Sequence, residues 1–181
     1  VPVGFLMADA TNTVASKLPH AKFAIVDFSA PGLKDKPQNV QGLLFKEQEA
    51  GYLAGYLAGL WAKDNKAQAV STVGGQKIPP VDHYIAGFQA GAKKASPGIK
   101  TLNAYSQDFV DQAKCKEIAL NQIAQGSKVV FQVAGQCGLG ALDAAKEKGV
   151  LGIGADADQG YLGEHILTSA QKKVNVAVFE T

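Results

Sequence analysis

The stretch that decides the fold reads KVVFQVAGQCGLGALDAAKEKGVLGIGADADQ and covers residues 128–159. Its apolar run Val129–Val133 predicts a strand buried on both faces. After a glycine-rich turn, Leu139–Lys148 has the apolar spacing of a short helix that ends at a glycine. Val150–Ala155 predicts a second buried strand, which ends directly on Asp156. Two parallel strands joined by a helix bring both following loops to the carboxyl edge of one sheet, where open α/β sheets bind ligands.

The rest of the chain repeats this alternation. Further strands are predicted at Val3–Leu6, Phe23–Asp27, Val40–Phe45, Ala69–Val73, Thr101–Tyr105 and His165–Ser169. Further helices are predicted at Ala8–Lys17, Gln48–Lys63, Tyr84–Lys94 and Gln112–Gln125, with the start of another in Lys173–Glu180. Strands that alternate with helices of this length predict an α/β protein with doubly wound parallel sheets.

A Pro/Gly-rich break near residues 29–42 divides the predicted elements between two lobes. We expect residues 1–44 to be part of an N-terminal lobe and residues 45–168 to be a complete C-terminal lobe. Residues 169–181 would then return to the N-terminal lobe.

The long predicted helix Gln48–Lys63 carries two kinds of residue at helical spacing. Large apolar residues, Leu53, Leu57 and Leu60 among them, alternate with glycines and alanines that suit close packing. The aromatic residues Tyr52, Tyr56 and Trp61 are predicted to pack in the core or between lobes.

Composition and motifs exclude several function classes. The 181 residues are 46% hydrophobic and 19% charged, with a net charge of +2 and scattered basic residues, which indicates no nucleic-acid partner. No apolar run approaches the ~20 residues that span a bilayer. The three histidines lie in separate segments and no GxSxG motif is present, so we expect no metal site, no catalytic residue and no cofactor.

The two cysteines, Cys115 and Cys137, lie in the first turns of successive predicted helices. Such helices are neighbours on one face of the sheet, so a disulfide between them is possible and would imply an oxidising, extracytoplasmic setting. Two buried thiols in a reducing compartment are the alternative.

Polar candidates follow the predicted strands. Asp27 and Asp156 each end a strand, where a carboxylate can accept two hydroxyl hydrogen bonds or simply cap the next turn. Lys172, just after the last strand, either reaches this edge or is solvated. The aromatic residues near strand ends, Phe5, Phe28 and Phe109, are candidates to stack on a ring.

The glycine loop at residues 135–140 reads GxxGxG, not the GxGxxG of dinucleotide-binding loops. We expect its backbone amides to face a polar ligand group at the start of a helix. A tight turn without a ligand is the alternative.

Several segments together resemble the basic membrane protein family. They are the helix FKEQEAGYLAGYLAG (residues 45–59), GGQKIPPVDHYIAGFQAGAK (74–93), VVFQVAGQCGLGALDAAKEKGV (129–150), GIGADADQ (152–159) and ILTSAQKKVNVAV (166–178). GFLMADATNTVASKLPHAKFAIVD (4–27) is also similar to that family, so the resemblance covers nearly the whole chain. Two positions depart from the family pattern. Ala155 stands where the family pattern GVDxDQ has valine, and Asn175 stands where the pattern TSxxKxVD has its last aspartate.

The resemblance implies a substrate-binding lipoprotein of an ABC importer with the fold of type I periplasmic binding proteins. It implies an extracytoplasmic, lipid-anchored protein whose partners are a nucleoside, with purines favoured, and a membrane permease. Asp27 would hold the base, and Gly138 and Asp156 the ribose, with Lys172 close by. It also implies that this chain is a fragment with one complete lobe and part of the other.

Apart from the resemblance, the same residues predict capture of a polyhydroxylated ligand between two lobes, without chemistry. A sugar receptor of the same fold and a ligand-sensing regulatory domain remain alternatives, and a small α/β enzyme is a third.

Overall fold

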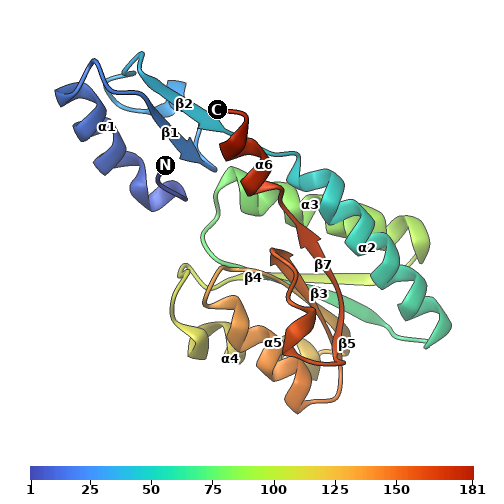
Figure 1. Cartoon of the computed structure of the whole chain (residues 1–181). Helices are drawn as coiled ribbons and strands as arrows, with labels where there is room; N and C mark the ends of the chain where they lie inside the picture. Colours follow the sequence, from blue (N-terminus) through green and yellow to red (C-terminus); the bar gives the residue numbers. More distant parts are fainter. The chain divides into compact units, whose positions relative to one another are not determined.

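The computed structural model describes residues 1–181 and separates them into two compact units (Figure 1). The first unit consists of Val1–Phe45 and Lys173–Thr181, and the second of Lys46–Lys172. Each unit has a parallel sheet of its own. No helix in either unit has the length and apolar character required to cross a membrane.

The first unit is built on two parallel strands, β1 (Phe23–Val26) and β2 (Val40–Leu43). Its helices are α1 (Ala8–Lys17), α6 (Val174–Phe179) and the short 3-10 helices η1 (Phe5–Met7) and η2 (Ala30–Gly32). The predicted strand Val3–Leu6 is wrong, because only Val3 bridges to Val26. Gly4 then adopts a φ of +89°, which turns the chain out of the sheet and into η1.

The second unit contains a five-stranded parallel sheet in the order β4-β3-β5-β6-β7. Its strands are β3 (Ala69–Gly74), β4 (Lys100–Tyr105), β5 (Ser127–Val133), β6 (Leu151–Asp156) and β7 (Ile166–Gln171). Its helices are α2 (Glu47–Asp64), α3 (Pro79–Ala95), α4 (Gln112–Ala124) and α5 (Gly138–Glu147), with the 3-10 helix η3 (Gly160–Leu162). The predicted α/β class with doubly wound parallel sheets is confirmed.

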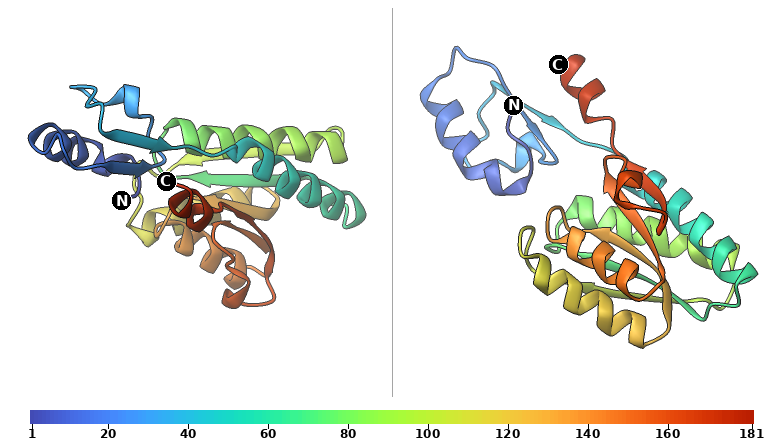
Figure 2. Two further views of the ribbon diagram at one scale, coloured as in Figure 1. Left: turned by 45° about the horizontal axis from the view of Figure 1, so that its top comes forward. Right: turned by 60° about the horizontal axis from the view of Figure 1, so that its bottom comes forward.

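The strand β5 shows why helices cover both faces of this sheet. Val129 and Phe131 point into one core, which α2 and α3 complete. Val130 points into the other core, which α4 and α5 complete. All three side chains are fully buried, so the apolar run of β5 reflects burial on both faces. The helices on the two sides of the sheet can be followed in Figure 2.

The helices α2 and α3 pack through small residues rather than through leucines. The buried face of α2 consists of Glu47, Gly51, Ala54, Gly55, Ala58, Gly59 and Ala62. A Cβ added to Gly59 would lie 2.6 Å from the carbonyl oxygen of Ala92 on α3, so the two backbones approach closely. Leu53 is instead 70% exposed.

Tyr52 and Tyr56 also lie on the exposed side of α2, at 36% and 38% exposure, and stack on each other with ring centroids 6.3 Å apart. Of their two predicted places, the core is therefore wrong and packing between lobes stays a prediction, whereas Trp61 packs against the core. The glycine and alanine face of α2 is the one that is buried, because it lets the axes of α2 and α3 approach closely.

Two predicted boundaries differ from the structure. The helix expected from Tyr84 begins at Pro79, since proline is well suited to the first turn of a helix. The last strand continues to Gln171, paired with β6, so residues 169–172 belong to the second unit and not to the return segment.

Candidate functional site

The carboxyl edge of the second unit brings Asp156 and Lys172 together. Asp156 ends β6, and Lys172 directly follows β7, its parallel neighbour. The main-chain N–H of Lys172 donates a hydrogen bond to the carbonyl oxygen of Asp156 at 2.8 Å. These two candidates from the sequence thus lie at adjacent strand ends.

Asp156 has an unusual backbone. Its φ is +66°, and the N–H of Ala157 donates to the carbonyl oxygen of Ala155 at 2.8 Å, which closes a three-residue turn around it. Such a turn is rare for a residue with a side chain, and strain of this kind concentrates at functional sites. The turn leaves the side chain of Asp156 54% exposed at the edge.

Lys172 connects Asp156 to a buried carboxylate. Its side chain is 5% exposed, and its Nζ lies 3.4 Å from Glu47 Oε1 and 3.5 Å from Asp156 Oδ1. Glu47 is the first residue of α2 and its side chain is 3% exposed. We call these three side chains the charged cluster. A carboxylate in the first turn of a helix is also stabilised by the helix dipole.

Two further side chains border the charged cluster. The hydroxyl of Tyr84, on α3, donates to the carbonyl oxygen of Ala170 at 3.0 Å, and the Tyr84 hydroxyl oxygen also lies 3.4 Å from Asp156 Oδ1. The Nζ of Lys172 lies 5.4 Å from the centre of the Tyr84 ring, within the range of a cation–π contact. His83 Nδ1 lies 3.5 Å from Glu47 Oε2, on the exposed side.

Gly138, which was predicted in the turn before the helix, is the first residue of α5 and is buried. Its N–H donates to the carbonyl oxygens of Ala134 and Gly135, and a Cβ at this position would overlap the amide of Gln132. The glycine therefore makes room for a neighbouring side chain, while a direct ligand contact of Gly138 stays a prediction. Gly135 and Gln136 are the exposed members of this loop.

A buried amide network supports the edge and was not foreseen from the sequence. Gln132 Nε2 donates to Gln159 Oε1 at 2.7 Å, and the same oxygen accepts the N–H of Ala155 at 3.1 Å. The N–H of Gln159 donates to Ser169 Oγ at 3.0 Å. The network ties the ends of β5, β6 and β7 together. A polar residue at a fully buried position of the apolar run, Gln132, was the available signal.

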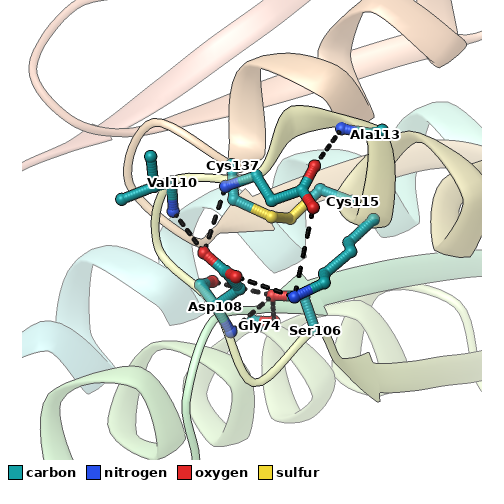
Figure 3. Close-up of polar contacts among 9 residues, drawn as sticks. Gly74, Ser106, Asp108, Val110, Ala113, Cys115 and Cys137 are labelled. Atoms are coloured by element: carbon teal, nitrogen blue, oxygen red, sulfur yellow. Dashed lines mark hydrogen bonds and ion pairs between the residues drawn. A yellow bond between two sulfur atoms is a disulfide. The ribbon is translucent and has the colours of Figure 1, made fainter.

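Figure 3 shows the loop between β4 and α4, which carries Phe109. Asp108 Oδ1 accepts the N–H groups of Val110 and Asp111 at 2.8 and 3.0 Å, and its Oδ2 accepts from Lys114 Nζ at 2.8 Å. The hydrogen bond from Lys114 and those two backbone groups hold the pKa of Asp108 well below its usual range. The loop is therefore held by its own side chains.

A disulfide joins α4, which follows this loop, to the glycine loop. Cys115, in α4, is bonded to Cys137, which precedes α5, with a Cα–Cα distance of 5.5 Å (Figure 3). Both cysteines are fully buried. The N–H of Cys137 also donates to the carbonyl oxygen of Phe109 at 3.0 Å. Phe109 itself is partly buried and lies against Gly75, so its ring is fixed near the carboxyl ends of β3 and β5.

The candidates Asp27 and Phe5 belong to the first unit. Asp27 directly follows β1, has a φ of +63°, and donates its N–H to the carbonyl oxygen of Leu43 at 2.9 Å. The N–H of Gly4 donates to the carbonyl oxygen of Val26 at 3.0 Å, so Phe5 follows the chain at the same end of β1. Phe28, the next residue after Asp27, packs against Gly32.

The second unit therefore offers an exposed carboxylate backed by an ammonium group and a phenol. This arrangement can accept hydrogen bonds from hydroxyls and can donate to an oxygen or ring nitrogen. No group of three or more histidine, cysteine or acidic side chains has a metal-binding arrangement.

Comparison with known proteins places the chain among ABC-transporter proteins. Residues 1–181 match the family model Bmp, described as "ABC transporter substrate-binding protein PnrA-like". Basic membrane protein B of Borrelia garinii subsp. bavariensis is 34% identical over 180 residues, which cover 98% of this chain and 52% of that protein. An uncharacterised lipoprotein of Pyrococcus abyssi is 35% identical over 99% of this chain and 46% of its own length. The chain thus spans about half the length of these curated relatives.

Solved structures agree with this placement. An ABC-transporter solute-binding protein from Aeropyrum pernix K1 has a TM-score of 0.86 and 29% identity, covering 98% of this chain and 52% of that one. A transcriptional activator of the comK gene from Bacillus halodurans, at a TM-score of 0.79 and 23% identity, covers 98% of this chain and 59% of its own. A periplasmic solute-binding protein from Actinobacillus succinogenes with bound D-allose, at 0.69 and 13%, covers 96% and 76%. The last two show the fold alone.

Proposed function

Since the chain belongs to the Bmp family of PnrA-like ABC-transporter substrate-binding proteins, we propose that the full-length protein captures a nucleoside, with purines favoured, and delivers it to a membrane permease. The observation that carries this proposal is the exposed carboxylate of Asp156, held at the carboxyl edge by Lys172 and Tyr84. Binding without chemistry is part of the proposal, because the charged cluster contains no nucleophile paired with a base.

The chemistry of the edge suits the sugar part of a nucleoside. Asp156 can accept hydrogen bonds from two neighbouring hydroxyls, and such bonds to a charged acceptor are stronger than neutral ones. Phe109, fixed by its loop, is a candidate to stack on the base. We propose that Asp27 and Phe5 of the first unit also contact the ligand, and that Gly138 contacts the ribose as the resemblance implies.

The proposed location follows from the family and the relatives. We propose that the full-length protein works outside the cytoplasm and is attached to the membrane by a lipid. The relative from Pyrococcus abyssi carries the word lipoprotein in its name. A buried disulfide is consistent with an oxidising compartment.

A sugar is the second candidate ligand. The solute-binding protein from Actinobacillus succinogenes, which shares the fold, holds D-allose. A carboxylate that accepts two hydroxyl bonds serves a free sugar as well as a ribose. A ligand-sensing regulatory domain is the alternative from a different functional class, because the comK activator from Bacillus halodurans shares the fold.

The test is thermal unfolding of the full-length protein with purine and pyrimidine nucleosides, free bases, pentoses and hexoses. Ligand that binds only the folded state stabilises it by RT ln(1 + [L]/Kd). We expect a rise in Tm with nucleosides and none with free sugars. A rise in Tm with a sugar alone would show that the ligand is a sugar and not a nucleoside, while the protein would remain a substrate-binding protein. No rise with any ligand would contradict a receptor for either.

A further inference from the structure

We propose that Glu47 determines the specificity of this edge for uncharged ligands, by holding Lys172 and setting the net charge of the cluster. The inference rests on the proposed function, since it takes Asp156 as a ligand contact. In this role Glu47 is a positioning residue, because it acts through Lys172 rather than by touching the ligand.

The geometry separates Glu47 from solvent and from the exposed edge. Its side chain is 3% exposed, one oxygen lies 3.4 Å from Lys172 Nζ and the other 3.5 Å from His83 Nδ1. Asp156, on the other side of Lys172, is 54% exposed. The ammonium group of Lys172 therefore lies between a buried carboxylate and an exposed one.

The charges explain what Glu47 contributes. The charges of Lys172 and Asp156 alone would sum to zero, and a lysine ammonium is a frequent ligand of phosphate. With Glu47 the cluster of Glu47, Lys172 and Asp156 carries one net negative charge. The positive charge of Lys172 is then compensated from the buried side, while Asp156 remains able to accept hydroxyl bonds. A phosphorylated ligand meets net repulsion, which is stronger in a buried setting than in water.

The same helix offers a matched control. Glu49 lies two residues further along α2, its side chain is 64% exposed, and it pairs with the exposed Lys46 at 3.2 Å. Glu49→Gln removes the same charge from a solvated position. Exposed pairs of this kind contribute little, so this change should leave ligand discrimination as it is.

The experiment measures, by calorimetry on the full-length protein, the affinities of two pairs of compounds: adenosine with adenosine 5′-monophosphate, and ribose with ribose 5-phosphate. The wild type should prefer the uncharged member of a pair. Glu47→Gln should reduce this preference about tenfold, the effect of removing one nearby charge in a partly buried setting. An unchanged preference in a folded Glu47→Gln protein overturns the inference.

A second comparison, between two variants that lack Lys172, keeps the test decisive if the Glu47→Gln single variant does not fold. Lys172→Gln leaves two carboxylates, and Lys172→Gln with Glu47→Gln leaves only Asp156. Both variants should bind more weakly, because Lys172 is itself a candidate contact, so the preference is the quantity to compare. It should be about tenfold larger in Lys172→Gln than in the double variant, since the two differ only in the Glu47 charge. Equal preferences in these two variants overturn the inference as well.

Failure of the two proposals gives different results. A wild-type protein that binds neither adenosine nor ribose overturns the proposed function and this inference with it. A wild-type protein that binds an uncharged ligand, but whose preference does not depend on Glu47, overturns this inference alone.

Discussion

The backbone of Lys172 is hydrogen-bonded to the backbone of Asp156, N–H to carbonyl at 2.8 Å, while the side chains of the same two residues lie 3.5 Å apart. The backbone pairing of β6 and β7 thus places residues 156 and 172 next to each other, whatever side chains they carry. These two side chains need no loop to bring them together.

Asp156→Ala in the full-length protein should weaken nucleoside binding by about 2 kcal/mol, the usual contribution of hydrogen bonds to a charged acceptor. Isothermal calorimetry measures this directly. Asp158→Ala, two residues along the same loop, is the control: its carboxylate accepts the N–H of Gly160 within the turn and should matter little for binding. Unchanged affinity in Asp156→Ala would remove Asp156 from the site.

Replacing both cysteines by serine should lower the free energy of unfolding by about 3 kcal/mol, because the disulfide closes a loop between residues 22 apart. Urea unfolding of the oxidised wild type and of the Cys115→Ser/Cys137→Ser variant gives the difference. The variant should also show faster hydrogen exchange in residues 106–111, the loop that Cys137 holds through Phe109. Equal exchange in this loop would show that Asp108 alone maintains it.

Gly55→Ala should destabilise the protein by about 2 kcal/mol, since a Cβ there would overlap the backbone of Phe88 on α3 and the packed helices must move apart. Leu53→Ala, on the exposed side of the same helix, should change stability by less than about 0.5 kcal/mol. Thermal or urea unfolding compares the two. A larger loss for Leu53→Ala would mean that its side chain is covered.

Stability should fall as the solution is made mildly acidic, and His165 should contribute to this. Burial and the nearby positive charge of Lys146 lower the pKa of His165 below its usual 6.5, against the opposing effects of Asp143 and a backbone hydrogen bond to Leu142. The unfolded chain therefore takes up its proton first, and stability is lost as the pH falls from 6.5 towards the pKa in the folded protein. Urea unfolding of His165→Gln over this range should give a flatter pH dependence than the wild type. An equally steep curve would assign the effect to other groups.

The order of strands and helices could be predicted because apolar runs and glycine-terminated helices leave a direct trace in the sequence. The same rule placed Asp156 and Lys172 at one edge, since residues that follow parallel strands meet there. The sequence could not reveal Glu47 or Tyr84 as their neighbours. Both are buried on helices and reach the edge only through packing, which depends on residues far away in the chain.

The faces of α2 were harder to predict for a related reason. Hydropathy assigns Leu53 to the core, yet the glycine and alanine side of the helix is buried instead. Close contact between the backbones of α2 and α3 determines which side of α2 is buried, and a hydropathy scale does not include such contacts. At Gly4, similarly, the backbone conformation ended a strand that the apolar pattern had extended.

The glycine contact between α2 and α3 also determines which changes this chain can accept. A survey of all single substitutions should find that Gly51, Gly55 and Gly59 tolerate almost no other residue, because each faces the backbone of α3. On the opposite side of the same helix, Leu53 and Leu57 should accept polar residues. The least tolerant positions of this helix are then its smallest residues, the reverse of the ranking that hydrophobicity would give.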